Sequence, residues 1–265
     1  MRWFDTGVNL LDPRFDILQV LDESKLAGVS DILVISSDIE ESFAARDLCR
    51  KINTEQSTQA SPIFLHQTAG VHPHYAEQAD PVTWAKLEQI LADNTISAVG
   101  ECGLDFNRNY SSPQAQLKAF DVQLQLAKSL NKGVYLHERE AFEKQHGMLK
   151  HVSSSLPFKV AHCFTGTVEQ LKAYLALDCY IGITGWVCDD KRGQTLQDAV
   201  KVLPLERILL ETDAPYLFPK TLRPRQRDNA PKYLSAIAQK VAELKGISVG
   251  EVALAAYENA CSLFK

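Results

Sequence analysis

The chain has 265 residues, a length that suits either two small domains or one α/β barrel, because barrels of about 250 residues are common single domains. Hydrophobic residues make up 45% of it and charged residues 23%, a composition that allows a buried core without disulfides. The 28 Lys and Arg residues against 33 Asp and Glu residues give a net charge of −5, which excludes a broad basic surface that would coat nucleic acid. Any contacts with phosphate must therefore be local.

The six cysteines form no Cys-x-x-Cys pair, and several lie inside apolar runs, so we expect reduced, buried thiols. The N-terminal segment lacks the uninterrupted apolar region of a signal peptide, and no apolar run reaches the roughly 18 residues that a membrane span needs. These features predict a soluble, cytoplasmic protein with no membrane association. No obligate protein partner is evident.

Apolar, strand-like runs recur at intervals of roughly 20 to 35 residues along the chain. They lie near residues 3 to 9, 31 to 37, 64 to 71, 97 to 101, 133 to 137, 158 to 162, 179 to 184 and 207 to 212. Amphipathic segments of helical period separate them, such as the one after Ser112-Pro113, in which Leu117, Phe120 and Leu124 fall on one face. The last run is followed by a polar, proline-interrupted loop over 219 to 231 and by helical segments near 231 to 245 and 248 to 263.

Strand and helix alternate throughout this pattern. The continuous hydrophobicity before His137 and His162 is typical of parallel strands that helices cover on both faces. About eight such units predict a (β/α)8 TIM barrel that forms one domain over residues 1 to 265. The alternative is an open, doubly wound sheet, but such a sheet usually carries a glycine-rich turn after its first strand, and this chain has none there.

Four potential metal ligands follow apolar runs: Glu101, His137, His162 and Asp213. Any one of them alone is more simply a hydrogen-bonded histidine or carboxylate. Together they supply imidazole and carboxylate, the donors that divalent metals take, from several strands to one common mouth. Catalysis in a parallel barrel occurs at that mouth, so the pattern predicts a divalent-metal hydrolase.

His72 and His74 follow another strand-like run, with Pro73 restricting the backbone between them. Either could be a metal ligand or could contact substrate, and a histidine at the mouth can donate to a phosphoryl oxygen or move a proton. The alternative is a rigid polar turn without a role in chemistry.

Six segments, in this order and spacing, closely resemble the TatD family of metal-dependent deoxyribonucleases: GVHPH, GECGLDF, LHEREA, AHCFTGT, YIGITGW and ETDAPYL. The resemblance runs over nearly the whole chain and implies an amidohydrolase-type TIM barrel, a metallo-dependent hydrolase that cleaves DNA phosphodiesters from the 3′ end. It places the bridging carboxylate on Glu101 and two histidine ligands on His137 and His162. It also implies that Asp213 binds metal or activates water and that His72 touches the scissile phosphate.

The first strand departs from the family's usual Asp-x-His-x-His, because Asp5, Gly7 and Asn9 stand at those positions. Glycine offers no side-chain donor and asparagine offers only a carbonyl oxygen, so the metal nearest this strand depends on carboxylates, water and substrate oxygens. This donor set suits Mg²⁺, or Mn²⁺, better than Zn²⁺, with one or two ions bound. A second departure keeps Arg139 of the family's HTRDA-like block but lengthens its acid to Glu140.

Candidate substrate contacts lie in loops that follow strands. Arg108 follows the fourth run, and Arg223, Arg225 and Arg227 lie in the loop after the last one, where guanidinium groups suit phosphate. The alternative is a solvated basic loop. Trp186 either stacks on a base or packs against the protein. The scarcity of other basic residues favours single-stranded DNA or frayed ends as the substrate.

Two other functions fit the same barrel. A small-molecule amidohydrolase, such as a lactonase or deaminase, would use the same mouth, but such enzymes usually keep the first-strand histidine pair. A non-catalytic nucleic-acid-binding barrel would not need Glu101, His72, His137, His162 and Asp213 together. Both alternatives therefore rank below a deoxyribonuclease.

Overall fold

The computed structural model describes residues 1–59 and 61–265 and shows eight parallel strands, each hydrogen-bonded to the next in chain order. The strands are β1 (Trp3–Val8), β2 (Val29–Val34), β3 (Phe64–Ala69), β4 (Ile96–Asp105), β5 (Gly133–Arg139), β6 (Lys159–Ala161), β7 (Cys179–Ile183) and β8 (Ile208–Leu210). The ring closes between β8 and β1 through a bridge between Val8 and Ala214 and a hydrogen bond of 2.9 Å from the Asp213 amide to the Gly7 carbonyl. The predicted TIM barrel is confirmed.

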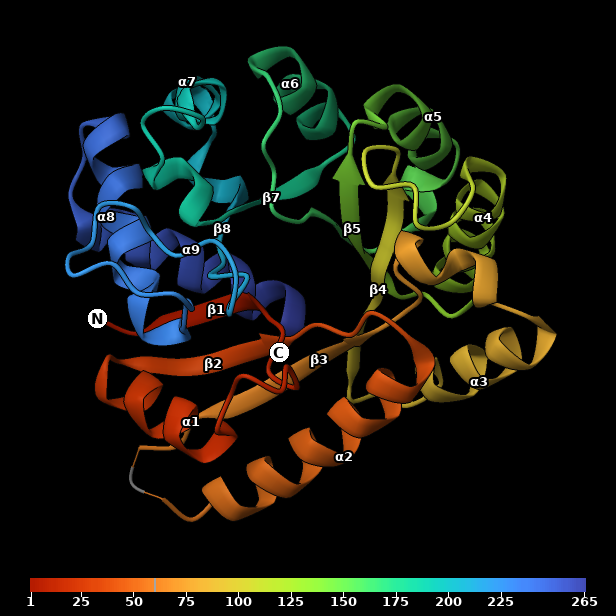
Figure 1. Ribbon diagram of the computed structural model, residues 1–265, viewed down its shortest axis with the longest axis horizontal. Coiled ribbons are helices and arrows are strands. Elements are labelled where there is room, and N and C mark those ends of the chain that lie inside the picture. The colour runs from red at the N-terminus through yellow and green to blue at the C-terminus, as the bar shows by residue number, and fades with distance from the viewer. Residues whose placement is uncertain (60) are drawn as a thin grey trace.

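Helices surround the strands and cover the outer face of the barrel (Figure 1). They are α1 (Ile17–Leu26), α2 (Ile39–Gln56), α3 (Pro81–Leu91), α4 (Pro113–Ser129), α5 (Phe142–Val152), α6 (Val168–Ala176), α7 (Gln194–Val202), α8 (Leu234–Lys245) and α9 (Val249–Phe264). Helix α4 begins as expected, with the Ser112 side chain accepting from the Ala115 amide and with Pro113 in the first turn. Phe120 and Leu124 of its apolar face are buried, as the helical period predicts.

The core has two parts. A large one fills the space between strands and helices, and a smaller one lies inside the barrel around Phe4, Leu33, Ala98, Val160 and Leu209. Four of these inner residues come from the early or middle parts of their strands, and Leu33 lies near the end of β2. Polar side chains such as Glu101 and His137 stand further along β4 and β5. The barrel is therefore packed with apolar side chains below and lined with polar groups at its mouth.

The expected strands all occur, but β4 continues to Asp105 and β5 to Arg139, beyond the apolar runs that predicted them. Backbone pairing continues there, since Gly103 and Asp105 pair with His137 and Arg139. Glu101 and His137 consequently lie within strands rather than after them. All six cysteines are free thiols, as expected. In the part of the chain that the structure describes, every helix is too short or too polar to span a membrane.

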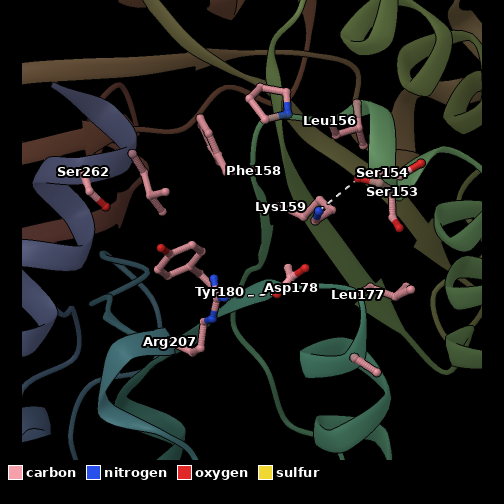
Figure 2. A pocket seen from close by; sticks show the side chains of 13 residues that line it. Ser153, Ser154, Leu156, Phe158, Lys159, Leu177, Asp178, Tyr180, Arg207 and Ser262 are labelled. Atoms are coloured by element: carbon pink, nitrogen blue, oxygen red, sulfur yellow. Dashed lines mark hydrogen bonds and ion pairs between the residues drawn. The ribbon is translucent and has the colours of Figure 1, made fainter.

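A cavity of about 660 Å³ lies at the end of the barrel opposite the mouth, near the starts of β6 and β7 (Figure 2). The amine of Lys159 donates to the carbonyl of Ser153 at 3.0 Å, at the carboxyl end of α5, and Arg207 pairs with Asp178 at 3.1 Å. Both cations are thus already engaged with protein groups. This cavity is remote from the predicted metal ligands, which lie at the carboxyl ends of the strands.

Candidate metal centre

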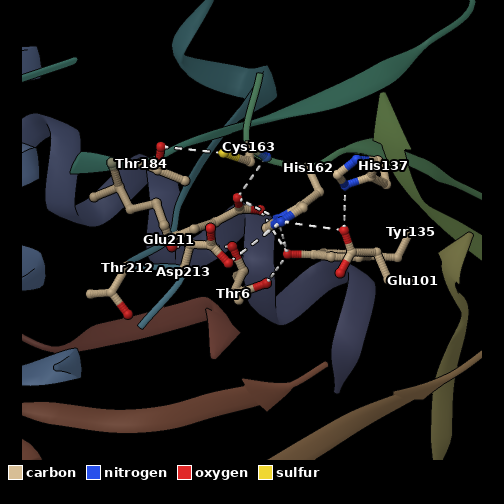
Figure 3. Close-up of polar contacts among 12 residues, drawn as sticks. Thr6, Glu101, Tyr135, His137, His162, Cys163, Thr184, Glu211, Thr212 and Asp213 are labelled. Atoms are coloured by element: carbon tan, nitrogen blue, oxygen red, sulfur yellow. Dashed lines mark hydrogen bonds and ion pairs between the residues drawn. The ribbon is translucent and has the colours of Figure 1, made fainter. Parts of the chain in front are cut away.

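The structure brings the four predicted ligands together at the carboxyl end of the barrel. Glu101 comes from β4, His137 from β5, His162 directly follows β6, and Asp213 lies three residues beyond the end of β8. Figure 3 shows His137 and His162 directed towards the carboxylate of Glu101. Two ligand groups result, one of His72, Glu101 and His137 and one of His162, Cys163 and Asp213, each with donor atoms within 4.8 Å of one another.

Glu101 joins these two groups. Its Oε1 atom lies 2.8 Å from Nδ1 of His137, 3.6 Å from Nε2 of His72 and 3.8 Å from Nε2 of His162. Burial favours the neutral form of Glu101, but the neighbouring imidazoles of His72, His162 and His137 outweigh burial and hold its pKa well below the ordinary value. Glu101 is therefore an anion at the centre of the cluster.

His162 is fixed through its Nδ1 atom. Nδ1 lies 2.7 Å from the Tyr135 hydroxyl and 2.8 Å from Oε2 of Glu211, so it carries a proton that these oxygens accept. Nε2 is left facing the mouth, 3.8 Å from Oδ1 of Asp213. Because the second nitrogen of a metal-bound histidine is held by a carboxylate or a similar acceptor, this arrangement is that of a histidine prepared to bind metal through Nε2.

The carboxylates of the cluster carry more negative charge than the neighbouring histidines neutralise. Burial raises the pKa of Asp213 to about 7, despite the nearby His162. Burial lowers the pKa of His162, but Glu211 and Glu101 outweigh it and raise the pKa to about 10. In this environment the Asp213 carboxylate favours an added proton or cation, and a divalent metal fits that requirement.

The surroundings of His137 also fit a metal. Burial lowers the pKa of His137, but Asp105 and Glu101 raise it to about 9. Its Nε2 atom is buried and has no hydrogen-bond partner among the described residues, although Oδ2 of Asp105 lies 3.4 Å away. A buried imidazole nitrogen without a partner is costly, and a coordinated cation would satisfy it.

His72 differs from the other two histidines. Its Nδ1 atom accepts a hydrogen bond of 3.1 Å from the backbone amide of His74, and burial together with the neighbouring His137 lowers its pKa well below the ordinary value. A neutral histidine whose Nδ1 accepts must carry its proton on Nε2. His72 is therefore a hydrogen-bond donor towards Glu101 and the mouth, although its position alone would also suit a ligand.

Asp105 and His74 extend the site. Oδ2 of Asp105 accepts from Nε2 of His74 at 2.8 Å, and its Oδ1 accepts from the backbone amides of Asn107 and Arg108. His74 also packs edge to face against Tyr110, with ring centroids 4.7 Å apart. Asp105 thus holds His74 by a hydrogen bond and places a carboxylate oxygen 3.4 Å from Nε2 of His137.

The first strand supplies no imidazole. Asp5 is buried, and its carboxylate accepts from the amide and hydroxyl of Thr212 at 2.9 and 2.6 Å, which fastens β1 to the end of β8. Burial raises the pKa of Asp5 to about 7. The side-chain amide of Asn9 donates to Oδ1 of Asp213 at 3.2 Å, so Asn9 supports that carboxylate through its nitrogen rather than presenting a carbonyl oxygen.

The predicted substrate residues divide between two parts of the rim. Trp186, Arg225 and Arg227 line one cavity of about 230 Å³, and Arg192 lies over the Trp186 ring at 4.7 Å. Arg225 and Arg227 form no ion pair with any described residue, so their charges are free for a ligand. Arg108 lies elsewhere, exposed after β4, and donates to the Tyr110 hydroxyl at 3.3 Å.

The family model for TatD related DNase matches residues 4–265. The chain belongs to the TatD family. It is 43% identical to the 3'-5' ssDNA/RNA exonuclease TatD of Erwinia tasmaniensis, over 98% of this chain and 99% of that protein. It is 42% identical to the protein of the same name from Erwinia billingiae, over 99% and 98%. A member of this family is a hydrolase that acts on phosphodiester bonds, which favours the nuclease over the small-molecule hydrolase and the binding barrel.

Solved structures agree with this assignment. A TatD family hydrolase from Entamoeba histolytica superposes with a TM-score of 0.89 at 25% identity, covering 100% of this chain and 98% of that one. A TatD homologue from Escherichia coli gives a TM-score of 0.85 at 29% identity, covering 99% and 98%. A phosphotriesterase homology protein from Escherichia coli, at 13% identity and a TM-score of 0.68, shares the fold over 100% of this chain and 99% of that one.

Three residues that contact the predicted ligands were not selected from the sequence: Asp105, Tyr135 and Glu211. Asp105 lies four positions after Glu101, Tyr135 lies two positions before His137, and Glu211 lies two positions before Asp213. Side chains two apart along a strand share a face, so this spacing was an available signal.

Proposed function

We propose that the protein is a metal-dependent 3′–5′ exonuclease that shortens single-stranded DNA or RNA, or frayed DNA ends, and that residues 1–265 act as one catalytic domain. The relatives named 3'-5' ssDNA/RNA exonuclease support the polarity and the single-stranded substrate. The observation that carries the proposal is the position of Glu101, whose Oε1 atom lies within 3.8 Å of nitrogens of His72, His137 and His162. A carboxylate between two ligand groups is suited to serve both.

Glu101, His137, His162 and Asp213 would hold one or two divalent ions. A bound divalent ion supplies positive charge that polarises a phosphoryl oxygen and lowers the pKa of bound water. Because β1 offers no nitrogen donor, the site favours Mg²⁺ or Mn²⁺ over Zn²⁺. Tyr135 and Glu211 keep the Nε2 atom of His162 directed to the mouth.

Asp213 and His72 take the proton-handling and charge-stabilising roles. Asp213 is partly exposed at the mouth, held by Asn9, and accepts a proton from the attacking water or orients it. His72 donates from Nε2 to a phosphoryl oxygen, because its Nδ1 atom is occupied by the His74 amide. His74, whose Nε2 atom is held by Asp105, lies beside His72 and contacts the substrate.

The rim supplies contacts to the strand. Arg225 and Arg227, exposed and without ion-pair partners in the described chain, bind phosphates beside Trp186. A base stacked on Trp186 adds about 1 to 3 kcal/mol to the free energy of binding. Arg192 already covers one face of the ring, so the base stacks on the other face. Arg108 binds the backbone on the opposite part of the rim.

Cleavage of end-labelled single strands tests the proposal. The chelator-stripped protein is supplied with Mg²⁺, Mn²⁺ or Zn²⁺ and given DNA or RNA oligonucleotides labelled at either end, beside the Asp213→Asn variant. We expect stepwise shortening from the 3′ end with Mg²⁺ or Mn²⁺, and its loss in Asp213→Asn. Shortening from the 5′ end, or no cleavage with any of the three metals, would contradict the proposal.

A further inference from the structure

Gly7 and Tyr135 compete for one space at the metal mouth. A Cβ atom at position 7 would lie 2.6 Å from the Tyr135 hydroxyl oxygen, closer than such atoms approach. The next nearest atoms, Cε1 of His162 and Cβ of Glu211, are at 3.4 and 3.5 Å, which are ordinary or slightly tight contacts. Gly7 does not have a positive φ, so the backbone does not require glycine here. The Tyr135 hydroxyl does.

That hydroxyl is fully used. It lies 2.7 Å from the Thr6 carbonyl and 3.0 Å from Oε1 of Glu211, and both of these oxygens accept. A tyrosine hydroxyl has one proton to donate, so its lone pairs accept from Nδ1 of His162, 2.7 Å away. The hydroxyl thus links β1, β5 and the residue after β6, and it fixes which nitrogen of His162 faces the mouth.

We infer that Tyr135 and Gly7 act as a pair that sets the metal preference of the site: Tyr135 is a positioning residue that presents His162 to a divalent cation, and its hydroxyl excludes any ligand from position 7. The inference rests on the metal site of the proposed function. Position 7 is closed to an imidazole, and positions 5 and 9 carry a carboxylate bonded to Thr212 and an amide bonded to Asp213, so the first strand gives no nitrogen ligand to a metal. A site with few nitrogens favours Mg²⁺ and Mn²⁺ over Zn²⁺.

The competing explanation is that Tyr135 only fills the inner core, where its ring packs near Val160 and Leu209. The Tyr135→Phe variant separates the two, because it keeps the ring and removes the hydroxyl. Tyr174→Phe is the matched control: Tyr174 is as deeply buried, in α6, and its hydroxyl has no hydrogen-bond partner among the described residues.

Metal affinity tests the positioning role without nucleic acid. Mn²⁺ binding is measured from the electron paramagnetic resonance signal of free Mn²⁺ for the wild type and both variants. We expect Tyr135→Phe to weaken binding about 10- to 100-fold, the usual effect of losing a group that orients a ligand, and Tyr174→Phe to leave it unchanged. Equal affinity in Tyr135→Phe and wild type, or an equal loss in Tyr174→Phe, would overturn the role.

Urea unfolding tests the competition for space. We expect Gly7→Ala to lower the midpoint strongly, and the double variant Gly7→Ala/Tyr135→Phe to lower it by less than the sum of the two single changes, because the second change removes the atom that the new methyl group meets. Additive shifts would overturn the pairing.

The preference itself is tested with Gly7→His/Tyr135→Phe, which opens the space and supplies a nitrogen. We expect the ratio of Zn²⁺ to Mn²⁺ affinity to rise above that of Tyr135→Phe alone, and an unchanged ratio would overturn the exclusion of a ligand from position 7. A wild-type protein that binds Mn²⁺ but cleaves no nucleic acid would contradict the proposed function and leave this inference standing. A wild-type protein that binds no divalent ion would overturn the inference.

Discussion

Asp105 is the residue whose role extends furthest beyond its own contacts. It is almost fully buried at the end of β4, and its two oxygens have separate tasks. Oδ1 accepts from the amides of Asn107 and Arg108, which shapes the loop, and Oδ2 holds His74 and faces Nε2 of His137. One carboxylate thus shapes the loop, holds His74 and faces His137 of the proposed metal site.

We expect Asp105→Asn to lower the rate of cleavage about 10- to 100-fold, because it removes the negative charge that orients His74 and His137 while the amide oxygen can still accept from the loop. Steady-state cleavage of a labelled single strand, together with the urea midpoint, measures the effect. The matched control is Asp121→Asn, an exposed carboxylate on α4 whose contact is to Gln125 at 3.4 Å. A rate within twofold of the control would contradict the orienting role.

At the residue scale, the sequence pointed to the candidate ligands but not to the residues that hold them in place. Glu101, His137, His162 and Asp213 stand out because polar residues interrupt apolar runs, and the structure gathers all four. Tyr135 and Glu211 do not stand out, since each reads as part of the strand-like run before a histidine or aspartate. Their hydrogen bonds to His162 depend on which strands are neighbours and at what register, which a single sequence does not specify.

The loop after β8, over residues 211 to 230, contains three arginines, of which Arg225 and Arg227 line a cavity at the rim. Arg225 and Arg227 are exposed there and have no ion-pair partner in the part of the chain described by the structure, whereas Arg223 donates to the carbonyls of Lys220 and Leu222 at 2.7 and 2.8 Å. The loop thus contains two free guanidinium groups and one that is already engaged within it.

We expect Arg225→Ala/Arg227→Ala to weaken binding of single-stranded oligonucleotides and to reduce the dependence of log K on log salt by about 1.4, since each phosphate contact contributes about 0.7. Fluorescence anisotropy over a salt series measures this, with Asp213→Asn as the background so that the oligonucleotide stays intact. Arg223→Ala is the control and should leave the slope unchanged. An unaltered slope in the double variant would show that these arginines contact solvent rather than phosphates.

At the scale of elements, the alternation of strand and helix was predictable because apolar runs and helical faces differ in period. The order β1 to β8 followed from that alternation, since parallel neighbours need crossover helices. The lengths of β4 and β5 were underestimated because Glu101, Gly103 and Asp105 are not strand-like by composition. Pairing with the neighbouring strand, rather than local preference, extends β4 to Asp105.

A buried ionic network joins early and late parts of the molecule at the end opposite the metal centre. Asp31 of β2 accepts from His66 of β3 at 3.1 Å and pairs with Lys265, after α9, at 3.0 Å. Burial raises the pKa of Asp31, but the hydrogen bonds from His66 and Lys265 outweigh burial and hold it below the ordinary value. A carboxyl group with a lowered pKa in the folded state stabilises the fold above its unfolded pKa, and that contribution is lost as the pH falls.

We therefore expect Asp31→Asn to lower the free energy of unfolding at pH 7, and the difference from wild type to shrink as the pH falls below about 4, through the folded-state pKa of Asp31. Urea unfolding of both proteins between pH 7 and pH 3 measures the difference. Asp47→Asn is the control, since Asp47 is a largely exposed carboxylate on α2 whose one ion pair among the described residues is with its neighbour Arg46. A difference that stays constant down to pH 3 would show that Asp31 acts through packing rather than charge.

The metal centre couples the barrel as a whole, because its proposed ligands come from β4, β5 and the segments after β6 and β8. A cation that binds only when these four parts are assembled stabilises the folded state by mass action, by about 2.7 kcal/mol at a concentration of 100 times its Kd. For a domain of this size, that free energy corresponds to a rise in Tm of roughly 5 to 10 °C. We expect this rise when Mn²⁺ is added to the chelator-stripped protein, measured by differential scanning fluorimetry, and we expect none in Glu101→Ala. An equal rise in Glu101→Ala would place the stabilising ion outside the barrel mouth, since that variant lacks the carboxylate that joins the two ligand groups.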